Sequence, residues 1–134
     1  MINVARHDFK LNLVPASRPR VGKFGTYYSK TYQSFKDSMK VIVANMEFKK
    51  VESGPIHVYT RVYKQMPKSW SKKEKDKMRG TFVITNVGDN DNIEKAAWDQ
   101  LNGFAWGDDC QIAWNETKAT WHDEGYFYIV VSKL

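Results

Sequence analysis

The sequence predicts an α+β fold in one compact domain over residues 1–134, with a mixed β-sheet, a long N-terminal helix and a short helix that carries an acidic motif. Helical and strand-like hydrophobic periodicities occur in turn along the chain. Hydrophobic residues make up 42% of the chain and aromatic residues 14%, which is enough for a real core. No internal repeat or low-complexity linker divides the chain.

The first half predicts a strand, a loop, a helix and a second strand. Apolar and polar residues alternate over residues 9–13, as in a half-buried strand. Prolines and glycines mark residues 14–28 as a loop. Ser29 can cap a helix, because apolar residues then recur every three or four positions through residues 32–46. Residues 56–63 alternate at period two and predict a strand.

The second half predicts two helices and three strands around the acidic motif. Residues 69–79 form a lysine-rich, exposed short helix. The β-branched residues within 81–86 predict a strand that leads to the acidic segment, and a helix follows over residues 91–101. Two strand-like runs, residues 110–114 and 126–131, complete the pattern. The acidic motif is therefore expected at a junction between a strand and a helix.

Acidic and basic residues are segregated along the chain, whose net charge is +6. Basic residues dominate residues 61–79, whereas acidic residues dominate the last third. A basic surface attracts phosphates through counterion release, and an acidic pocket repels them unless metal ions neutralise it. The combination favours a nucleic-acid partner. A solvated lysine face with no partner is the alternative.

Several functional classes are excluded by absent motifs. There is no apolar run of about 18 residues and no signal sequence, so we expect a cytoplasmic protein without a membrane anchor. The single Cys110 excludes an intramolecular disulfide and a zinc motif, and we expect it to be a buried strand residue. The chain has no Walker loop and no nucleophile elbow, and its histidines are scattered.

Residues 88–109 concentrate aspartates in two clusters joined by an amphipathic stretch. Carboxylate oxygens are the ligands that Mg²⁺ and Mn²⁺ prefer, so this pattern is typical of a metal site. Asp91 with Glu94 three residues later also matches a capping box, which needs no metal. The spacing alone leaves both interpretations open.

Helical periodicity separates two faces within this segment. One face carries an apolar stripe that should pack on the core, namely Ile93, Ala97 and Leu101. The other carries Asp91, Lys95 and Asp99, which lie within about 80° of each other on a helical wheel. Asp109 follows a turn at Gly107, so Asp89, Asp91 and Asp109 converge if the next strand runs back alongside.

The order and spacing of these residues resemble the RusA family, which are Holliday junction resolvases of phages and prophages. The similarity is carried by Asp89-Asn90-Asp91-Asn92-Ile93-Glu94-Lys95-Ala96, by Asp99 with Leu101-Asn102-Gly103, and by Asp108-Asp109-Cys110-Gln111-Ile112. Residues 15–20 and 69–73 also resemble family members, so the similarity covers nearly the whole chain. The chain departs from the family at Val87-Gly88, where many relatives have Lys-Pro.

The resemblance implies a homodimeric, Mg²⁺-dependent endonuclease that resolves four-way DNA junctions by paired symmetric nicks in recombination and repair. It implies Mn²⁺ as a possible substitute, no organic cofactor, and a phage or prophage protein acting in the bacterial cytoplasm. The catalytic metal ligands would be Asp89, Asp91 and Asp109, and Lys95 would stabilise phosphate charge or position the attacking water. Asp99 and Asp108 match acidic positions of unassigned role, and Asp99 can instead pair with Lys95 one turn away.

Basic residues outside the motif are candidates for contacts with the DNA backbone. They are Arg18, Arg20, Lys23, Lys68, Lys72, Lys73, Lys75 and Lys77. Tyr27, Tyr28 and Trp70 can stack on opened bases, although core packing is the simpler interpretation. Two other functions remain open: a DNA-binding module without catalysis, and a metal nuclease for flap or branched DNA or for RNA.

Overall fold

A four-stranded mixed sheet is the centre of the computed structural model, which describes residues 1–17, 19–84 and 89–134, without the side chains of Asp89 and Asn90. The strand order is β1-β6-β4-β5, with β1 and β4 antiparallel to β6 and with β5 parallel to β4. The strands span Ile2–Phe9 (β1), Ile56–Gln65 (β4), Ile112–His122 (β5) and Tyr126–Lys133 (β6). The mixed sheet in one α+β domain is as predicted.

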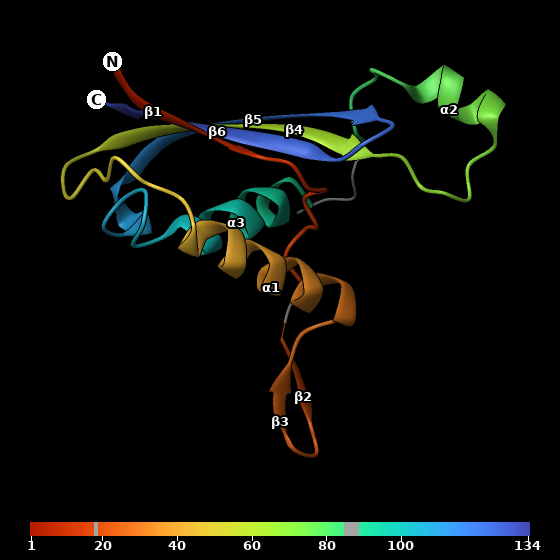
Figure 1. Cartoon of the computed structure of the whole chain (residues 1–134), viewed down its shortest axis with the longest axis horizontal. Helices are drawn as coiled ribbons and strands as arrows, with labels where there is room; N and C mark the ends of the chain where they lie inside the picture. The colour runs from red at the N-terminus through yellow and green to blue at the C-terminus, as the bar shows by residue number, and fades with distance from the viewer. Residues whose placement is uncertain (18, 85–88) are drawn as a thin grey trace.

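Two helices, α1 (Lys30–Ala44) and α3 (Asp89–Leu101), cover one face of this sheet (Figure 1). Helix α2 (Lys72–Met78) projects from one end of the sheet, and a small hairpin of β2 (Arg20–Gly22) and β3 (Gly25–Tyr27) projects below α1 (Figure 1). A 3₁₀ turn, η1 (Asp109–Gln111), precedes β5. Within the described ranges, no helix is long and apolar enough to span a membrane.

The core lies between the sheet and the two helices. The predicted strand at residues 56–63 is confirmed as β4, in which Ile56, Val58 and Val62 are completely buried. His57 and Arg61 on its other face are also buried, so β4 is covered on both faces there. Phe127 and Ile129 of β6 are buried beside the apolar side chains of β4. Each large apolar side chain removed from water in this way stabilises the fold by about 1.5–3 kcal/mol.

Helix α1 begins where the sequence predicts. The hydroxyl of Ser29 accepts a hydrogen bond from the backbone N–H of Tyr32, as expected of a cap. Tyr32, Phe35 and Met39 form the buried stripe. The helix ends at Ala44, earlier than predicted, so Val43 supplies its last buried side chain.

One predicted strand is wrong, and a second is described only in part. Residues 9–13 do not form a strand, because β1 ends at Phe9 and the buried Leu13 belongs to a loop. The predicted strand at residues 81–86 is seen in part: Phe82 makes an antiparallel bridge to Thr120 at the edge of β5, and residues 85–86 lie outside the described ranges. Two backbone hydrogen bonds of 3.0 Å flank this bridge, from the N–H of Val83 to the carbonyl oxygen of Ala119 and from the N–H of Trp121 to that of Thr81.

Two further predictions, for the loop at residues 14–28 and for Cys110, are corrected by the structure. The predicted loop at residues 14–28 contains the β2–β3 hairpin. Cys110 is exposed in η1 and is not a buried strand residue, because β5 begins only at Ile112. The short helix at residues 69–79 is confirmed as α2, with Ser71 as its cap.

The fold predicts a large cost for truncating the apolar stripe of α3. Leu101 is completely buried, so Leu101→Ala is expected to lower the free energy of unfolding by about 2–5 kcal/mol in urea denaturation. The control Val41→Ala, at a position on α1 that is 64% exposed, should change it by less than about 1 kcal/mol. Equal effects of the two changes would contradict the burial of this stripe.

Candidate metal centre

Helix α3 separates core and site residues as predicted. Ile93, Ala97 and Leu101 are completely buried, whereas Asp91 and Lys95 are exposed. The side chains on the second face therefore point away from the core and are accessible to a ligand.

Glu94 fixes α3 over β5 and does not cap the helix. Its Oε1 accepts hydrogen bonds from Asn115 Nδ2 at 2.8 Å and from Thr117 Oγ1 at 2.6 Å. The helix begins at Asp89, two residues earlier than predicted, so Asp91 lies inside its first turn. The capping-box interpretation of Asp91 and Glu94 is therefore wrong.

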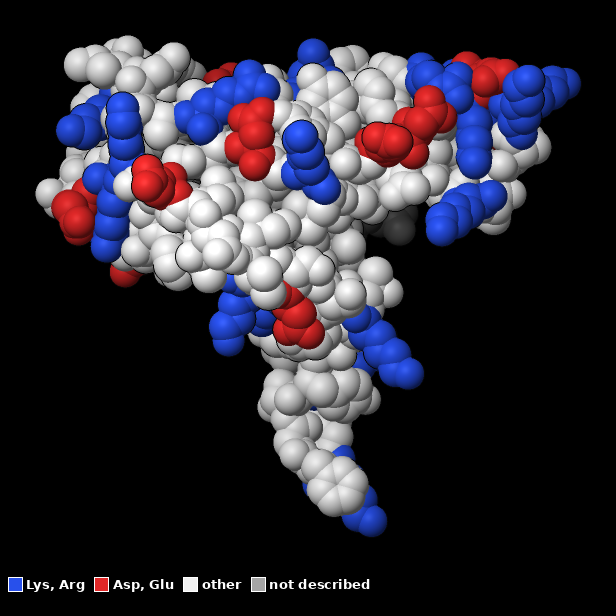
Figure 2. Space-filling view, in the orientation of Figure 1, with Lys and Arg blue, Asp and Glu red and all other residues white. Residues whose placement is uncertain are grey.

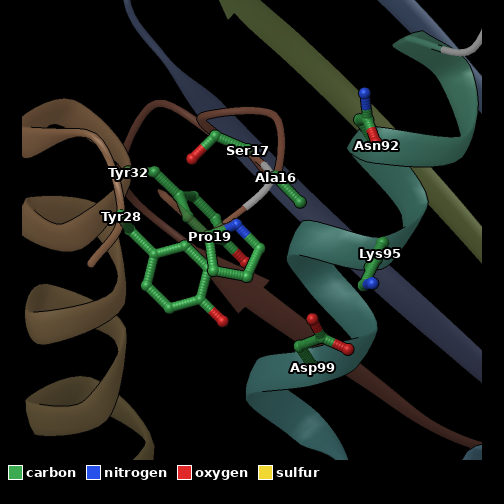
Figure 3. Close-up of a pocket in the computed structure, with 8 residues that line it drawn as sticks. All are labelled: Ala16, Ser17, Pro19, Tyr28, Tyr32, Asn92, Lys95 and Asp99. Carbon is green, nitrogen blue, oxygen red and sulfur yellow. The ribbon is translucent and has the colours of Figure 1, made fainter. Parts of the chain in front are cut away.

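A cavity of about 420 Å³ opens beside the exposed face of α3. Lys95 and Asp99, one helical turn apart, form one wall, and Pro19 and Tyr28 lie across from them (Figure 3). Lys95 and Asp99 form no ion pair, although both lie in the described part of the chain, so the i+4 pairing is wrong. The ammonium group of Lys95 is thus available to an anion in this cavity.

Tyr32 adds a hydrogen-bond donor to the same cavity. Burial raises the pKa of Tyr32 to about 12, and the negative charge of Asp99 contributes to the rise. The phenol therefore stays protonated at neutral pH. A cavity with an ammonium group and a phenolic O–H suits an anionic oxygen such as that of a phosphate.

Asp109 is oriented by Trp106. The indole Nε1 of the buried Trp106 donates a hydrogen bond of 2.6 Å to Asp109 Oδ1. Burial raises the pKa of Asp109; the Trp106 hydrogen bond opposes this rise, and the charges of Asp99 and Asp108 add to it. The carboxylates of Asp99 and Asp109 are therefore close enough to repel each other.

Asp108 and Gln111 build the turn that holds Asp109. Asp108 Oδ1 accepts a hydrogen bond from the backbone N–H of Cys110 at 3.1 Å. Gln111 Oε1 accepts from the backbone N–H groups of Gly107 and Asp108, at 2.8 and 2.9 Å. These reciprocal bonds form a capping box, which gives Asp108 a structural role.

Two of the three predicted metal ligands, Asp91 and Asp109, have side chains in the described part of the chain. Asp91 precedes Asp99 by two helical turns, about 12 Å along the axis, whereas Asp109 lies near Asp99. Among the described residues, no three His, Cys, Asp or Glu side chains are placed to hold one ion. The side chain of Asp89, the remaining predicted ligand, lies outside the described residues.

The chemistry of these side chains nevertheless fits a hard cation. Asp109 is partly buried, and two neighbouring carboxylates, Asp99 and Asp108, raise its pKa. A divalent cation bound to Asp109 would neutralise this excess negative charge and favour the ionised carboxylate. All of the side chains concerned have oxygen ligands, which Mg²⁺ and Mn²⁺ prefer.

Helix α2 presents four of the eight predicted DNA contacts. Lys72, Lys73, Lys75 and Lys77 lie on this helix, far from the body of the protein, and Figure 2 shows the basic side chains gathered there. Arg79, at its end, is held by Asp123 in two hydrogen bonds of 2.9 Å. This pair, which lowers the pKa of Asp123, ties α2 to the turn between β5 and β6.

The other predicted contacts divide between exposed and packed residues. Lys68 is exposed before α2, and Arg20 and Lys23 are exposed on the hairpin, whereas Arg18 lies outside the described residues. Trp70 packs against Trp121 with ring centroids 5.0 Å apart. This contact supports the packing interpretation of Trp70.

The fold and site together define a class: a small α+β protein with an acidic helix, a cavity that contains Lys95, and basic projections, as expected of a protein that acts on nucleic acid. Residues 11–132 match the family described as "Endodeoxyribonuclease RusA". The chain belongs to this RusA endodeoxyribonuclease family. The family that the acidic motif resembles is therefore confirmed, and the match covers most of the chain.

One curated relative comes from Bacillus subtilis (strain 168), where it is named "Uncharacterized protein YqaN". It is 33% identical to this chain over 81 residues, which are 58% of this chain and 57% of the relative. The match thus spans little more than half the length of that protein. Its name assigns no activity.

Trp106, Tyr32 and Glu94 have roles at the site that the local sequence patterns did not indicate. A tryptophan in the core needs an acceptor for its N–H, and Asp109 three residues later was a candidate. Tyr32 was assigned only to the core, although its hydroxyl group reaches the cavity wall. No local pattern indicated that Glu94 would bond to β5, because its partners lie 21 and 23 residues away.

The hydrogen bond from Trp106 is expected to hold down the pKa of Asp109. Trp106→Phe removes the bond that lowers the pKa, so the pKa of Asp109 should rise further in a ¹³C NMR titration of the metal-free protein. Trp114→Phe, at a half-exposed tryptophan, is the control and should leave it unchanged. An unchanged or lower pKa in the Trp106 variant would show that the indole does not act on this carboxylate.

The raised pKa of Asp109 also predicts how folding stability and cation affinity depend on pH. The folded-state pKa of Asp109 is raised, so its protonated form favours folding and this contribution is lost as pH rises through the folded-state pKa. Affinity for a divalent cation should instead increase as pH rises through this pKa, because protons compete with the cation for Asp109 at lower pH.

Proposed function

We propose that the protein is a Mg²⁺-dependent Holliday junction resolvase that acts in DNA recombination and repair. The observation that carries the proposal is the exposed face of α3, where Lys95 and Asp99 line a cavity and Asp91 lies one turn before Lys95, in a chain of an endodeoxyribonuclease family. A DNA-binding module without catalysis is less favoured. It gives no reason for Asp99, Asp108 and Asp109 to lie close together, where their like charge raises the pKa of Asp109.

In this proposal Asp89, Asp91 and Asp109 hold the cation, with Mn²⁺ as a possible substitute. Mg²⁺ bound there would activate water and stabilise the charge that develops on the phosphate. Asp99, whose charge acts on Asp109, could bind a second ion together with Asp109. No organic cofactor is required.

The remaining residues position the DNA. Lys95 Nζ binds a phosphate oxygen at the cavity, and the Tyr32 hydroxyl donates a hydrogen bond to the same group. Trp106 keeps one oxygen of Asp109 engaged, which directs the other toward the ligand. The lysines of α2 bind backbone phosphates at a distance from this site.

A homodimer would supply both cuts. One set of carboxylates cuts one strand, and a four-way junction has two-fold symmetry, so two protomers related by a dyad can make the paired nicks. The proposal places this dimer in the cytoplasm of a bacterial host, as part of a phage or prophage. Equilibrium sedimentation of the purified protein tests its oligomeric state.

The central test is Asp109→Asn. This change removes the charge but preserves the size of the side chain, so Mg²⁺-dependent junction cleavage should fall at least about 100-fold while junction binding without metal persists. Glu124→Gln, at an exposed acid in the turn between β5 and β6, is the matched control and should cleave normally. Normal cleavage by the Asp109 variant would remove Asp109 from the metal site.

The substrate is tested in the same assay. A four-way junction, a flap, a linear duplex and an RNA are compared at one salt concentration, because affinity for all of them depends on salt. The proposal requires preference for the junction. Preference for the flap or the RNA would favour the metal nuclease with another substrate.

The α2 lysines predict the salt dependence of binding. If both side chains contact phosphates, Lys73→Gln with Lys77→Gln should reduce the slope of log K against log salt by about 1.8, and should weaken junction and duplex binding alike. The control pair Lys49→Gln with Lys133→Gln lies elsewhere on the surface. Equal slopes in the two double variants would show that α2 does not contact DNA.

A further inference from the structure

The β2–β3 hairpin exposes apolar side chains on an arm that projects from the body (Figure 1). Its strands pair Arg20 with Tyr27 and Gly22 with Gly25, so Lys23 and Phe24 form the turn at the tip. Phe24 is 97% exposed and Val21 is 86% exposed. We call residues 20–27 the hairpin arm.

An isolated two-stranded hairpin is marginally stable in water. The aromatic ring of Tyr27 covers Gly22 across the hairpin, where an added Cβ would lie 2.8 Å from a ring carbon. Phe24 takes no part in this contact and is almost completely in water. Val21 and the 53% exposed Tyr27 lie on the same short arm as Phe24, so the exposed apolar surface is larger than one side chain and suits a surface that a partner covers.

The base of the hairpin arm is fixed to the helix of the candidate metal centre. The backbone N–H of Ala16 donates a 2.9 Å hydrogen bond to the carbonyl oxygen of Asn92, in α3. The hydroxyl groups of Ser17 and Ser29 lie 3.4 Å apart and join the two legs of the arm. Because Pro19 lines the same cavity as Lys95, the arm begins beside the proposed cleavage site (Figure 3).

The charge of the hairpin arm favours DNA over a second copy of the chain. No aspartate or glutamate occurs between Asp8 and Asp37. Arg20 and Lys23 are exposed on the arm, and Lys23 Nζ lies 5.9 Å from the centre of the Phe24 ring. Figure 2 shows basic and uncharged surface on the arm, without acidic side chains on the visible face. Two such arms in contact would repel each other, whereas phosphates would neutralise them.

We propose that Phe24 inserts at the branch point of a four-way junction and stacks on a base exposed there. This inference rests on the proposed junction specificity. Base stacking is interrupted where the strands exchange, so an aromatic ring can replace a lost neighbour at little cost, whereas in a linear duplex it must first unstack two base pairs. Lys23 holds the adjacent phosphate, and the attachment of the arm to α3 places the strand at the candidate metal centre.

The test compares variants of the whole protein without divalent metal. Phe24→Ala removes the ring, Phe24→Trp preserves stacking, and Val21→Ala is the control for loss of another exposed apolar side chain on the arm. Binding is measured by fluorescence anisotropy for a junction and for a linear duplex of the same arm sequence. A second junction carries 2-aminopurine at the branch point and reports stacking through its fluorescence.

We expect Phe24→Ala to weaken junction binding on the order of 10-fold, to leave duplex binding unchanged, and to abolish the protein-induced change in 2-aminopurine fluorescence. Phe24→Trp and Val21→Ala should behave like the unmodified protein. Lys23→Gln should weaken junction and duplex binding alike, because a phosphate contact does not depend on base stacking.

Three results would overturn the inference: equal junction affinity of the Phe24→Ala and unmodified proteins, equal losses for junction and duplex, or a change in molecular mass that assigns Phe24 to a contact between copies. Failure of the proposed function has a different signature. If the unmodified protein binds junction and duplex equally, junction specificity fails and the inference fails with it. If the unmodified protein prefers the junction and Phe24→Ala does so equally, only the role of Phe24 fails.

Discussion

The burial of one face of α3 determines where the acidic side chains of this protein can lie. Ile93, Ala97 and Leu101 have no solvent exposure, so the helix cannot rotate without losing several kcal/mol of apolar burial. Glu94 adds a directional constraint, since its two hydrogen bonds to β5 hold the helix at one rotation over the sheet. The accessibility of Asp91 and Lys95 follows from this packing and needs no interaction of their own.

The position of Asp109 depends on a second buried group. After α3 the chain turns at Gly103, whose φ of +84° suits glycine, and the backbone N–H of Gly103 bonds to the carbonyl oxygen of Trp106. The tight turn buries Trp106, and its indole N–H then requires an acceptor, which Asp109 supplies. A structural need therefore places a partly buried carboxylate next to Asp99, where like charge makes a cation favourable.

Local periodicity predicted the elements whose packing repeats along the chain, but not contacts between distant segments. The stripe of α1, the strand β4 and the two faces of α3 were predictable, because each follows from one period. The start of α3 was misplaced by two residues, and the described part of the strand predicted at residues 81–86 is a short pairing with the edge of β5, because edge pairing depends on the neighbour as well as on propensity. The acidic motif identified the candidate ligands by residue type and order. The separation of Asp91 and Asp99 along α3 could also be predicted, because it follows from the rise of a helix.

The separation of charge has a consequence for how DNA can be held. The carboxylates near Asp109 repel phosphates, so affinity must come from the basic projections, and α2 and the hairpin arm extend from the body in different directions (Figure 1). In the proposed function, binding at these projections can occur without metal, while cleavage requires the acidic centre to be neutralised. A strand can then be positioned by basic residues before a cation makes the centre tolerant of its phosphate, which makes shape recognition and chemistry separable steps on one small domain.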